Sequence, residues 1–598
     1  MDDPVIGIDL GTTNSAVGIV EAGFPILLAN EEGERLVPSV VWFGPEGAVK
    51  VGRAALREPE ANRTVRSAKR LMGQRFAERD QGVLRTLAAQ DGGIALALPD
   101  RVVTPPEVGA EILKELKRIA EYRLEGPVRR AVITVPAYFN NAQRAATKLA
   151  GEIAGLEVLR LVAEPTAAAL SYGMDKLDER SRVVVFDLGG GTFDVSLLEL
   201  REGVFEVLAT GGDTMLGGDD FDAALVAEVC ARLEKNSCET GESERFRREA
   251  ERVKCELSES EQSTFRVPFY DGTSSLEEGF SRAELEILLE PQLTGMKRIC
   301  GAVLVDGKVE PRDIEAVVLV GGSTRMPVVK GFAGEVFGRE PDCSQHPDEA
   351  IALGASIQAG ILAGTWRKVL LLDVTPLSLG IETLGGLMNV LIPRNTTIPC
   401  KAGELFTNAR DGQDRMRVRV LQGERELARD NWELGQFDLP FQPRVRGKAR
   451  VGVQFSLDEN GILEVLVRDV EGERDLVVEI ESAAVDVSDA AVEQMVSESV
   501  DHAFEDMNAR IFTEARLKAG ELLPAVQEAL REFGDDMEEG ERDEIEAARG
   551  AVVEALEGNS APALKGAVEQ LDEATEALAA RLVEQALSGQ LEDDKLNN

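Results

Sequence analysis

Two short segments rich in glycine and threonine have the residue types that bind phosphate. The first, residues 9–15 with the sequence DLGTTNS, lies between apolar runs at 5–8 and 17–20. Glycine lets such a turn approach a ligand closely, threonine hydroxyls and backbone N–H groups bind phosphate oxygens, and Asp9 can orient water on a magnesium ion. Taken alone this turn is a weak signal, because an ordinary glycine-bearing turn has the same pattern.

A near copy of this segment stands 178 positions further along the chain, where residues 187–194 have the sequence DLGGGTFD and again follow an apolar run. Two strand-turn-strand segments of one kind predict two duplicated lobes that hold one nucleotide between them. A third loop, residues 321–325 (GGSTR), is expected to present backbone groups and Arg325 to the adenosine end of that nucleotide. The sequence has no GxxxxGK[ST] pattern, which excludes a P-loop ATPase.

The elements that must position these loops are predicted by apolar runs. Near-continuous runs at 5–10, 131–135, 183–186 and 317–320 alternate with helical stretches in the first 366 residues. This pattern predicts an α/β architecture whose strands are covered on both faces.

The remainder of the chain has two other patterns. Period-two alternation at 451–457 and 463–467, around the turn 458–461, predicts an antiparallel hairpin in a β-rich region. Further along, apolar residues recur at helical spacing and predict a C-terminal helical bundle. They are Leu564, Val568, Leu571, Leu578 and Leu582.

Composition excludes several classes of partner. A length of 598 residues exceeds a single core and predicts several domains. With 66 basic and 107 acidic residues the net charge is −41, which excludes nucleic acid and anionic membranes as partners. No apolar run reaches the ~20 residues of a membrane span. The six cysteines have no C-x-x-C spacing and are interpreted as reduced thiols of a cytoplasmic protein.

Together the motifs resemble those of the actin, hexokinase and heat-shock ATPase superfamily and, within it, the DnaK family of seventy-kilodalton heat-shock chaperones. The matching segments are 6–15 (IGIDLGTTNS), 133–140 (ITVPAYFN), 164–169 (EPTAAA), 187–194 and 369–376 (VLLLDVTP). The match is dense and covers nearly the whole chain. It implies an α/β actin-like ATPase domain of duplicated ribonuclease H-like lobes, an antiparallel β-sandwich that binds peptide, and a C-terminal α-helical lid.

The resemblance also implies where these domains begin and end. The nucleotide-binding ATPase domain is expected at 1–366, the interdomain linker at 367–374, the β-sandwich at 375–485, the helical lid at 486–590 and a polar tail at 591–598. The tail lacks the terminal EEVD of eukaryotic cytosolic members, which favours a bacterial-type chaperone.

Catalytic roles follow from the same resemblance. Lys69 matches the lysine that contacts the γ-phosphate and helps to place the attacking water, and Glu164 matches the acidic residue near that phosphate. Asp187 and Thr192 complete the expected catalytic set. Without the resemblance, Lys69 would be interpreted as a solvated surface lysine and Glu164 as a helix N-terminal carboxylate.

Other residues are expected to bind metal or nucleotide. Asp9, Asp187 and Asp194 are expected to hold Mg²⁺ and K⁺, mostly through water. The residues expected to bind ATP or ADP are Gly11, Thr12, Thr13, Asn14, Gly189, Gly190, Gly191, Gly217, Gly218, Glu251, Lys254, Ser258, Gly321, Gly322, Ser323, Arg325 and Asp348. The alternative for Glu251, Lys254 and Ser258 is an ordinary surface pairing along one helical face.

The linker is the expected switch between the domains. In the family an apolar linker docks on the ATPase domain when ATP is bound, and the leucine triplet of 369–376 resembles it; an ordinary buried strand is the alternative. The residues expected to couple the domains are Pro136, Arg144, Arg160, Leu370, Leu371, Leu372 and Asp373. Arg160 also matches a residue that J-domain co-chaperones engage, although Ala163 stands where the family usually has Asn.

A second set of residues matches the family's peptide cleft. Its members are Leu379, Ile381, Leu384, Phe406, Ala409, Met416 and Val418. An extended peptide bound there would gain main-chain hydrogen bonds and insert an apolar side chain into a pocket. Composition alone would assign these residues to the hydrophobic core.

The function implied is that of an ATP-dependent chaperone that binds exposed apolar segments of unfolded proteins and releases them on ATP binding. Its expected partners are unfolded peptides, a J-domain co-chaperone and a nucleotide-exchange factor, and the protein is expected to be a monomer. An HscA-like chaperone for iron–sulphur cluster assembly is the alternative, because Met416, 205–222 and 423–427 resemble that branch. A filament ATPase, a sugar kinase-type enzyme and an exchange relative that does not need hydrolysis are further alternatives.

Overall fold

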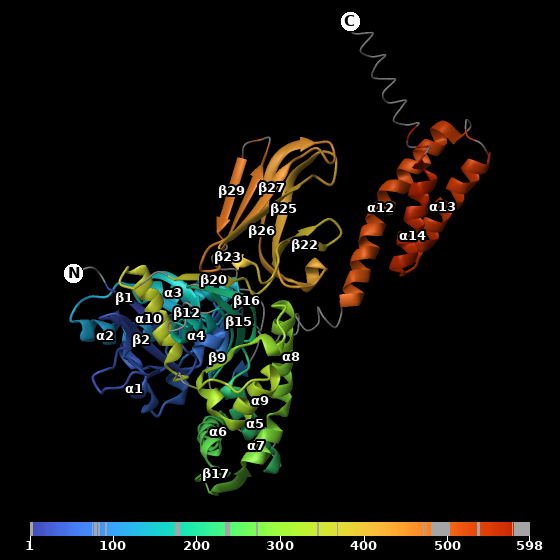
Figure 1. The fold of residues 1–598 in the computed structure, drawn as a ribbon. Helices are drawn as coiled ribbons and strands as arrows, with labels where there is room; N and C mark the ends of the chain where they lie inside the picture. The colour runs from blue at the N-terminus through green and yellow to red at the C-terminus, as the bar shows by residue number, and fades with distance from the viewer. Residues whose placement is uncertain are drawn as a thin grey trace. The chain divides into compact units, whose positions relative to one another are not determined.

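Two mixed sheets with corresponding strand orders form the early part of the chain (Figure 1). The computed structural model describes residues 4–580 except 75, 77–79, 82–83, 90–92, 174–179, 202, 234–239, 271–272, 344–345, 367–368, 471, 473, 480–502, 535–536, 538, 577 and 579. The predicted tail, the first two linker residues and the start of the predicted lid lie outside these residues.

The chain divides into two compact units, each of which is described by itself. The first unit comprises Met1–Leu379, Val390–Gln422 and Glu433–Glu493. The second comprises Gly380–Asn389, Gly423–Trp432 and Gln494–Asn598.

In the first sheet, three consecutive antiparallel strands follow one another and a parallel strand lies beside the first of them. The order is β13-β12-β1-β2-β3, with β4 paired to β2. The strands are β1 (Val5–Asp9), β2 (Asn14–Glu21), β3 (Phe24–Leu27), β4 (Val37–Pro38), β12 (Arg130–Val135) and β13 (Glu157–Ala163). All five residues of β1 are buried, as the continuous apolar run predicts.

The second sheet repeats this arrangement with the order β19-β14-β15-β16-β20-β23. Its strands are β14 (Ser181–Leu188), β15 (Phe193–Arg201), β16 (Val204–Asp213), β19 (Ala316–Val320), β20 (Leu370–Val374) and β23 (Thr397–Ile398). Strand β14 pairs antiparallel with β15 and parallel with β19, as β1 does with β2 and β12. The predicted duplication is therefore present in the strand topology.

Two helices pack closely beside these sheets. Helix α4 (Glu164–Gly173) contacts α10 (Ala350–Leu362), which also covers β1 and β2. A Cβ atom at Gly354 of α10 would lie 1.8 Å from the carbonyl oxygen of Ala167 in α4. Glycine is therefore required for this approach, because any side chain would separate the two helices.

Further elements extend each sheet region. In the first half these are α1 (Arg53–Leu56), η3 (Ala68–Leu71), α2 (Pro105–Leu124), α3 (Asn141–Ile153), the sheet β6-β5-β7 and the sheet β11-β10-β9-β8. The strands of these sheets are β5 (Val40–Phe43), β6 (Val49–Val51), β7 (Thr64–Arg66), β8 (Asp80–Gln81), β9 (Leu84–Ala88), β10 (Ile94–Ala97) and β11 (Val102–Val103). Helix α3 begins at a capping box in which Asn140 and Gln143 each bond the other's backbone N–H.

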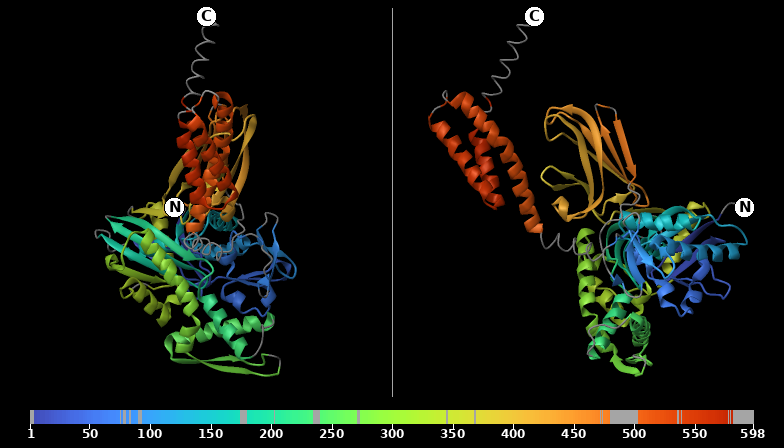
Figure 2. Two further views of the ribbon diagram at one scale, coloured as in Figure 1. Left: turned by 90° about the vertical axis from the view of Figure 1, so that its right-hand side faces the viewer. Right: turned by 180° about the vertical axis from the view of Figure 1, so that it is seen from behind.

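In the second half, helices and one hairpin gather at one end of the unit (Figures 1 and 2). They are α5 (Gly218–Arg232), α6 (Thr240–Glu259), α7 (Arg282–Leu288), α8 (Glu290–Asp306), α9 (Pro327–Phe337) and the hairpin of β17 (Gln262–Val267) and β18 (Leu276–Ser281). A continuous apolar core that includes Phe221, Phe246 and Phe265 joins these elements to β14 and β15.

The β-rich region contains the predicted hairpin. Strands β27 (Val451–Leu457) and β28 (Leu463–Asp469) pair antiparallel, with Leu457 opposite Leu463, in a sheet of order β24-β27-β28-β29. The other strands of this region are β21 (Leu379–Thr383), β22 (Leu387–Ile392), β24 (Cys400–Phe406), β25 (Gln413–Gln422), β26 (Trp432–Arg444) and β29 (Arg474–Glu479).

The second unit contains a helical bundle of α12 (Ala503–Phe533), α13 (Glu539–Glu557) and α14 (Ala561–Ala574), and Figure 2 shows these helices side by side. Leu564, Val568 and Leu571 of α14 are buried in its core, so this part of the helical prediction is confirmed, whereas Leu582 lies outside the described residues. Within the same unit, Arg425 forms an ion pair of 2.5 Å with Asp506 of α12. Among the helices that the structure describes, none combines the length and apolar character needed for a membrane span.

The interpretation of all cysteines as reduced thiols is wrong for Cys230. This residue of α5 is disulfide-bonded. Cys255, Cys300, Cys343 and Cys400 are free. Spacing along the chain did not reveal the bond because the fold, rather than a local motif, decides which sulfur atoms meet.

Candidate functional site

The three glycine-rich loops open into one cavity of about 570 Å³. The first loop joins β1 to β2, the second joins β14 to β15, and the third follows β19, so each lies at the end of a buried strand. Helix α6 contributes the remaining wall. The two duplicated hairpins therefore face a common space.

A lysine and four carboxylates gather at the inner end of this cavity. Lys69 of η3 forms a buried ion pair with Glu164, the first residue of α4. Asp9 ends β1 and accepts a hydrogen bond of 2.8 Å from the hydroxyl of Thr134. Asp194 of β15 accepts one of 3.1 Å from the backbone N–H of Tyr138, and Asp187 lies opposite it in the antiparallel pair of β14 and β15.

Burial raises the pKa of each of these three aspartates, and the Glu164 carboxylate is the second cause in every case. The pKa of Asp9 rises to about 7 and that of Asp194 to about 8. The pKa of Asp187 rises well above its usual value, with further contributions from Asp194 and Asp9. A single lysine does not neutralise the cluster, so the site favours an additional cation.

The Oδ2 atoms of Asp187 and Asp194 are buried and have no hydrogen-bond partner among the described residues. Oxygen atoms of this kind suit a magnesium ion or its water shell, so the donor set fits that metal. No group of three or more His, Cys, Asp or Glu side chains in the described part of the chain is arranged to ligate a metal directly. The sequence prediction of contacts made mostly through water is compatible with this arrangement.

Helix α6 lines the outer part of the cavity. Glu251, Lys254 and Ser258 all face it, together with Cys255. The Lys254 ammonium forms an ion pair of 2.8 Å with Asp222 and donates a hydrogen bond of 2.8 Å to the Gly218 carbonyl. These residues therefore belong to one wall rather than to an exposed helical face.

The third loop closes the cavity from the side of β19. The hydroxyl of Ser323 donates a hydrogen bond of 2.9 Å to the carbonyl of Gly189, which ties the third loop to the second. Arg325 forms an ion pair with Asp348. Both side chains of this pair line the cavity, where a guanidinium can stack on a planar ring.

Most of the residues predicted to act in catalysis or to bind nucleotide or metal line this cavity. The exceptions are Gly191, Gly217, Gly218 and Asp194. Sequence reasoning missed Asp219, Asp222, Cys255, Glu259, Met326, Pro347 and Ile351. Asp219 directly follows the predicted Gly218, and Asp222 lies one turn further along α5, so proximity in sequence was the available signal.

Comparison with known protein families shows which family this chain belongs to. The model of the family described as "Hsp70 protein" matches residues 5–584. The chain belongs to the Hsp70 family. Members of this family are chaperones that bind ATP or ADP with Mg²⁺ and hydrolyse ATP, and the match spans the loops, the β-rich region and the helical bundle alike.

Most of the segment predicted to be the interdomain linker forms strand β20 in the first unit. It pairs parallel with β16 and places Leu371 opposite Phe205. Leu371 is buried at 6% exposure, whereas Leu370 is 53% exposed, so the leucines of the triplet have unequal environments. Burial raises the pKa of Asp373, and the nearby Arg144 guanidinium opposes this shift.

Arg144 lies at the centre of further contacts in this Hsp70 chain. It donates hydrogen bonds to the carbonyls of Phe139 (3.1 Å), Ala137 (3.3 Å) and Asn460 (3.1 Å), of which the last lies in the β27–β28 turn. The Asn460 side chain also accepts a hydrogen bond of 2.8 Å from the backbone N–H of Leu161. The predicted Arg144 thus contacts the β-rich region, but Asn460 was not predicted.

A second contact between these regions involves α8. Asp306 forms an ion pair of 2.9 Å with Arg394 and accepts a hydrogen bond of 3.2 Å from Asn395. None of these three residues belongs to a motif that can be recognised in the sequence. Of the other residues predicted to couple the domains, Pro136 is buried after β12, and Arg160 of β13 is close enough to Asp373 to lower its pKa.

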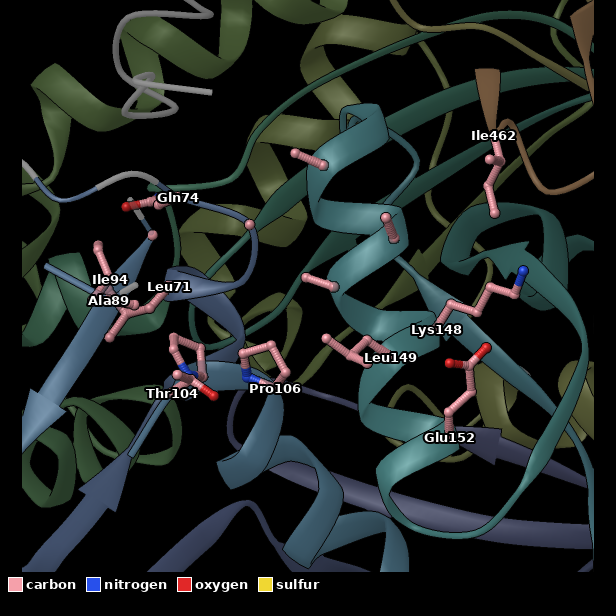
Figure 3. Close-up of a pocket in the computed structure, with 16 residues that line it drawn as sticks. Leu71, Gln74, Ala89, Ile94, Thr104, Pro106, Lys148, Leu149, Glu152 and Ile462 are labelled. Carbon is pink, nitrogen blue, oxygen red and sulfur yellow. The ribbon is translucent and has the colours of Figure 1, made fainter. Parts of the chain in front are cut away.

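A second cavity, of about 340 Å³, adjoins these contacts. Figure 3 shows Leu149, Lys148 and Glu152 on α3 at one side, Thr104 and Pro106 at another, and Ile462 approaching from the β-rich region. Ile462 is buried at 7% exposure. The loop after β27 therefore inserts both a polar and an apolar residue beside α3.

The residues predicted for a peptide cleft fall in both units, so each group is described in its own. In the first unit, Leu379 and Val418 are fully buried and Phe406, Ala409 and Met416 are half-buried. In the second unit, Ile381 is buried and Leu384 is 55% exposed. Their role in peptide binding stays a prediction.

Raising the pH from 6 to 8 is expected to tighten Mg²⁺-dependent ADP binding. Because burial raises the pKa of Asp9 to about 7 and that of Asp194 to about 8, well above the usual value of an aspartate, both groups are largely protonated at pH 6 and lose protons as the pH rises to 8. Their protonation stabilises the cation-free fold at low pH, and this contribution is lost as the pH rises through 7 to 8. A cation must displace these protons.

Calorimetric titration with Mg²⁺ and ADP in buffers of different ionisation enthalpy checks this linkage. Net proton release is expected at pH 6.5 and none at pH 9. The absence of release at the lower pH would contradict the assignment of these carboxylates to the metal site.

Proposed function

We propose that this chain is an ATP-dependent molecular chaperone that hydrolyses ATP in the 570 Å³ cavity and uses nucleotide state to bind and release apolar peptide segments. The observation that carries the proposal is the meeting of two duplicated phosphate-binding hairpins around Lys69 and Glu164. Membership of the Hsp70 family supports it, since the match extends over the β-rich and helical regions, which a filament ATPase or sugar kinase does not require.

In the proposed reaction, the protein positions groups more than it supplies covalent chemistry. Backbone N–H groups of the two hairpins and the hydroxyls of Thr12, Thr13 and Thr192 bind the phosphates. Lys69 contacts the γ-phosphate and orients the attacking water, with its ammonium held in place by Glu164. Asp9, Asp187 and Asp194 would hold Mg²⁺ and K⁺ mostly through water, and Mg²⁺ bound there would supply positive charge against the charge that develops on the phosphates.

The linker strand is the proposed link between hydrolysis and peptide binding. With ATP bound, β20 stays paired with β16, and Arg144 and Asp306 hold the β-rich region. After hydrolysis, release of the strand lets the peptide site close. A J-domain co-chaperone that engages Arg160 and a nucleotide-exchange factor are the proposed partners of this monomeric, cytoplasmic protein.

The proposed peptide site uses the residues that match the family's cleft. These are Leu379, Ile381, Leu384, Phe406, Ala409, Met416 and Val418. The domain boundaries at residues 366, 374, 485 and 590 are part of the same proposal. An extended segment would be held by main-chain hydrogen bonds and by one apolar pocket.

A bacterial-type chaperone specialised for iron–sulphur cluster assembly is the second candidate. Met416 favours it, because this half-buried residue of β25 is bulkier and more flexible than a β-branched side chain and changes the shape of an apolar pocket. The client would then be a scaffold peptide rather than a mixture of apolar segments.

Steady-state ATP hydrolysis, measured alone, with an unfolded client and with a cluster-scaffold peptide, tests the proposal. Mg²⁺-dependent turnover that an unfolded client stimulates supports a general chaperone, and stimulation by the scaffold peptide alone supports the specialised one. Asp187→Asn is expected to abolish turnover, while Asp475→Asn, a matched change at an exposed residue, preserves it. Turnover that survives Asp187→Asn would sink the proposed site.

A further inference from the structure

Two residues close to Lys69 in the sequence, Ser67 and Arg70, form contacts between the two halves of the nucleotide-binding region. Arg70 of η3 donates a hydrogen bond of 2.9 Å from Nε to the carbonyl of Gly191 and forms an ion pair of 2.5 Å with Asp220. Ser67, which precedes η3, donates a hydrogen bond of 2.9 Å to Asp219. Because η3 belongs to the first half and the three acceptors to the second, these bonds join the two halves beside the cavity, which Lys69 and Asp219 line.

Of the acceptors, Gly191 belongs to the second glycine-rich loop, and Asp219 and Asp220 lie in the first turn of α5. The backbone N–H groups of Gly218 and Asp219 donate to the carbonyls of Gly189 (3.0 Å) and Gly190 (2.7 Å), which fastens the start of α5 to that loop. Asp220 also accepts a hydrogen bond of 2.8 Å from the Gly217 N–H. A displacement of Arg70 would therefore also displace the loop that is proposed to bind the phosphates.

Two backbone features show how tightly this contact is built. A Cβ atom at Gly191 would lie 2.7 Å from Arg70 Nε, so only glycine admits the guanidinium. Ser67 has φ of 49° and ψ of 31°, a left-handed conformation that is costly for a residue with a side chain. The hydrogen bond to Asp219 is made by a residue held in a strained conformation.

We propose that Ser67, Arg70, Gly191, Asp219 and Asp220 form a cleft latch that sets the rate of nucleotide release. Lys69 pairs with Glu164 in the cavity, while its neighbour Arg70 pairs with Asp220 at the start of α5. A change at the phosphate end that moves η3 therefore moves the latch as well. Arg70 acts through the position of the lobes and is a positioning residue. The inference rests on the proposed nucleotide site and adds the residues that control exit from it.

Release of a fluorescent ADP, chased with excess ADP in a stopped-flow instrument, tests the latch in the full-length protein. Arg70→Ala is expected to release ADP about tenfold faster, because a charge-assisted bond and a second hydrogen bond are lost. Ser67→Ala, which removes one hydroxyl, is expected to give about a threefold increase. Single-turnover hydrolysis by both variants should stay within about twofold of the unmodified protein, because neither side chain reaches the reacting atoms.

Arg63→Ala is the matched control. Arg63 has a side chain of similar burial, 15% exposed against 12% for Arg70, but it bonds Asp100 and the Phe43 carbonyl within the first half. Its release rate should equal that of the unmodified protein. Arg70→Lys keeps the charge without the forked geometry and should release ADP at an intermediate rate.

Four other results would contradict the proposed latch. Unchanged release by Arg70→Ala excludes it, and so does equal acceleration by Arg63→Ala. Full restoration by Arg70→Lys would mean that charge alone retains the nucleotide, and a fall in single-turnover hydrolysis that matches the rise in release would place Arg70 in the catalytic machinery. If the unmodified protein fails to bind ADP, the proposed function fails too, whereas normal binding with unchanged variant release rejects the latch alone.

Discussion

A Lys69→Ala protein is expected to bind ATP and to hydrolyse it roughly 100- to 1,000-fold more slowly, the usual loss when one preorganised donor to a developing charge is removed. The Lys69 side chain is 5% exposed and pairs with Glu164 at the inner end of the cavity, surrounded by the carboxylates of Asp9, Asp187 and Asp194. In the proposed nucleotide site this is the position of the terminal phosphate of a bound triphosphate. Single-turnover hydrolysis and fluorescent ATP binding measure the two expectations separately.

Lys114→Ala is a suitable control for Lys69→Ala. Lys114 lies on α2, has a 44% exposed side chain and pairs with Glu111 at 2.7 Å. Its truncation to alanine removes the same positive charge as Lys69→Ala. Its hydrolysis rate is expected to be unchanged. Equal rates for the Lys69→Ala and unmodified proteins would remove Lys69 from the mechanism.

A stability measurement must accompany this comparison. Truncation of Lys69 leaves the buried Glu164 carboxylate without its cation, and breaking a buried ion pair typically costs about 3–5 kcal/mol. Thermal unfolding with and without Mg²⁺ and ADP separates the two effects. A variant that is still folded with bound nucleotide, yet does not hydrolyse ATP, assigns the loss to chemistry.

The duplicated sheets could be predicted because local sequence sufficed. The segments at 9–15 and 187–194 each combine a buried strand, a glycine turn and threonines, and these features depend on neighbours along the chain. Lys69 and Glu164 are 95 residues apart and meet only in the fold. The resemblance to a known family, rather than any spacing rule, brought them together in the prediction.

Long-range contacts that lack a motif were not predictable. Asn460 stands in an ordinary turn of a β-hairpin, and nothing local indicates that it bonds Arg144 and Leu161. The pair of Asp306 and Arg394 likewise depends on how α8 meets the β-rich region. Cys230 shows the same limit, since its disulfide bond follows from the fold and not from cysteine spacing.

The leucine triplet illustrates what the fold adds to a segment found by its composition. Its apolar character allowed either a linker or a buried strand; the segment forms a strand that pairs with β16 while Leu370 stays half exposed, and its role as a linker stays a prediction. The sequence does not distinguish three identical side chains. The strand does distinguish them, because successive residues point to opposite faces of the sheet and therefore have different environments.

Leu371→Asp is therefore expected to abolish the effect of ATP on peptide affinity. Leu371 is 6% exposed and packs in an apolar core with Phe205, Val207 and Leu198. Losing that burial costs about 1.5–3 kcal/mol, and a carboxylate in the same place adds a desolvation penalty. Since couplings between sites are typically about 1–3 kcal/mol, undocking of β20 is sufficient to eliminate this one. The ratio of peptide Kd with ATP to that with ADP should fall to about 1.

The neighbouring residue provides the control, because Leu370→Asp is the same substitution at a side chain on the opposite face of the strand, where Leu370 is 53% exposed. Its carboxylate remains in water, so the strand stays docked and most of the coupling is retained. Fluorescence anisotropy of a labelled apolar peptide, titrated with each variant in ATP and in ADP, measures both ratios. If the two variants lose coupling equally, the apolar character of the whole triplet is the switch and the burial of Leu371 is not. If both keep it, β20 transmits nothing, and the coupling must pass through Arg144, Asn460 and the Asp306–Arg394 pair instead.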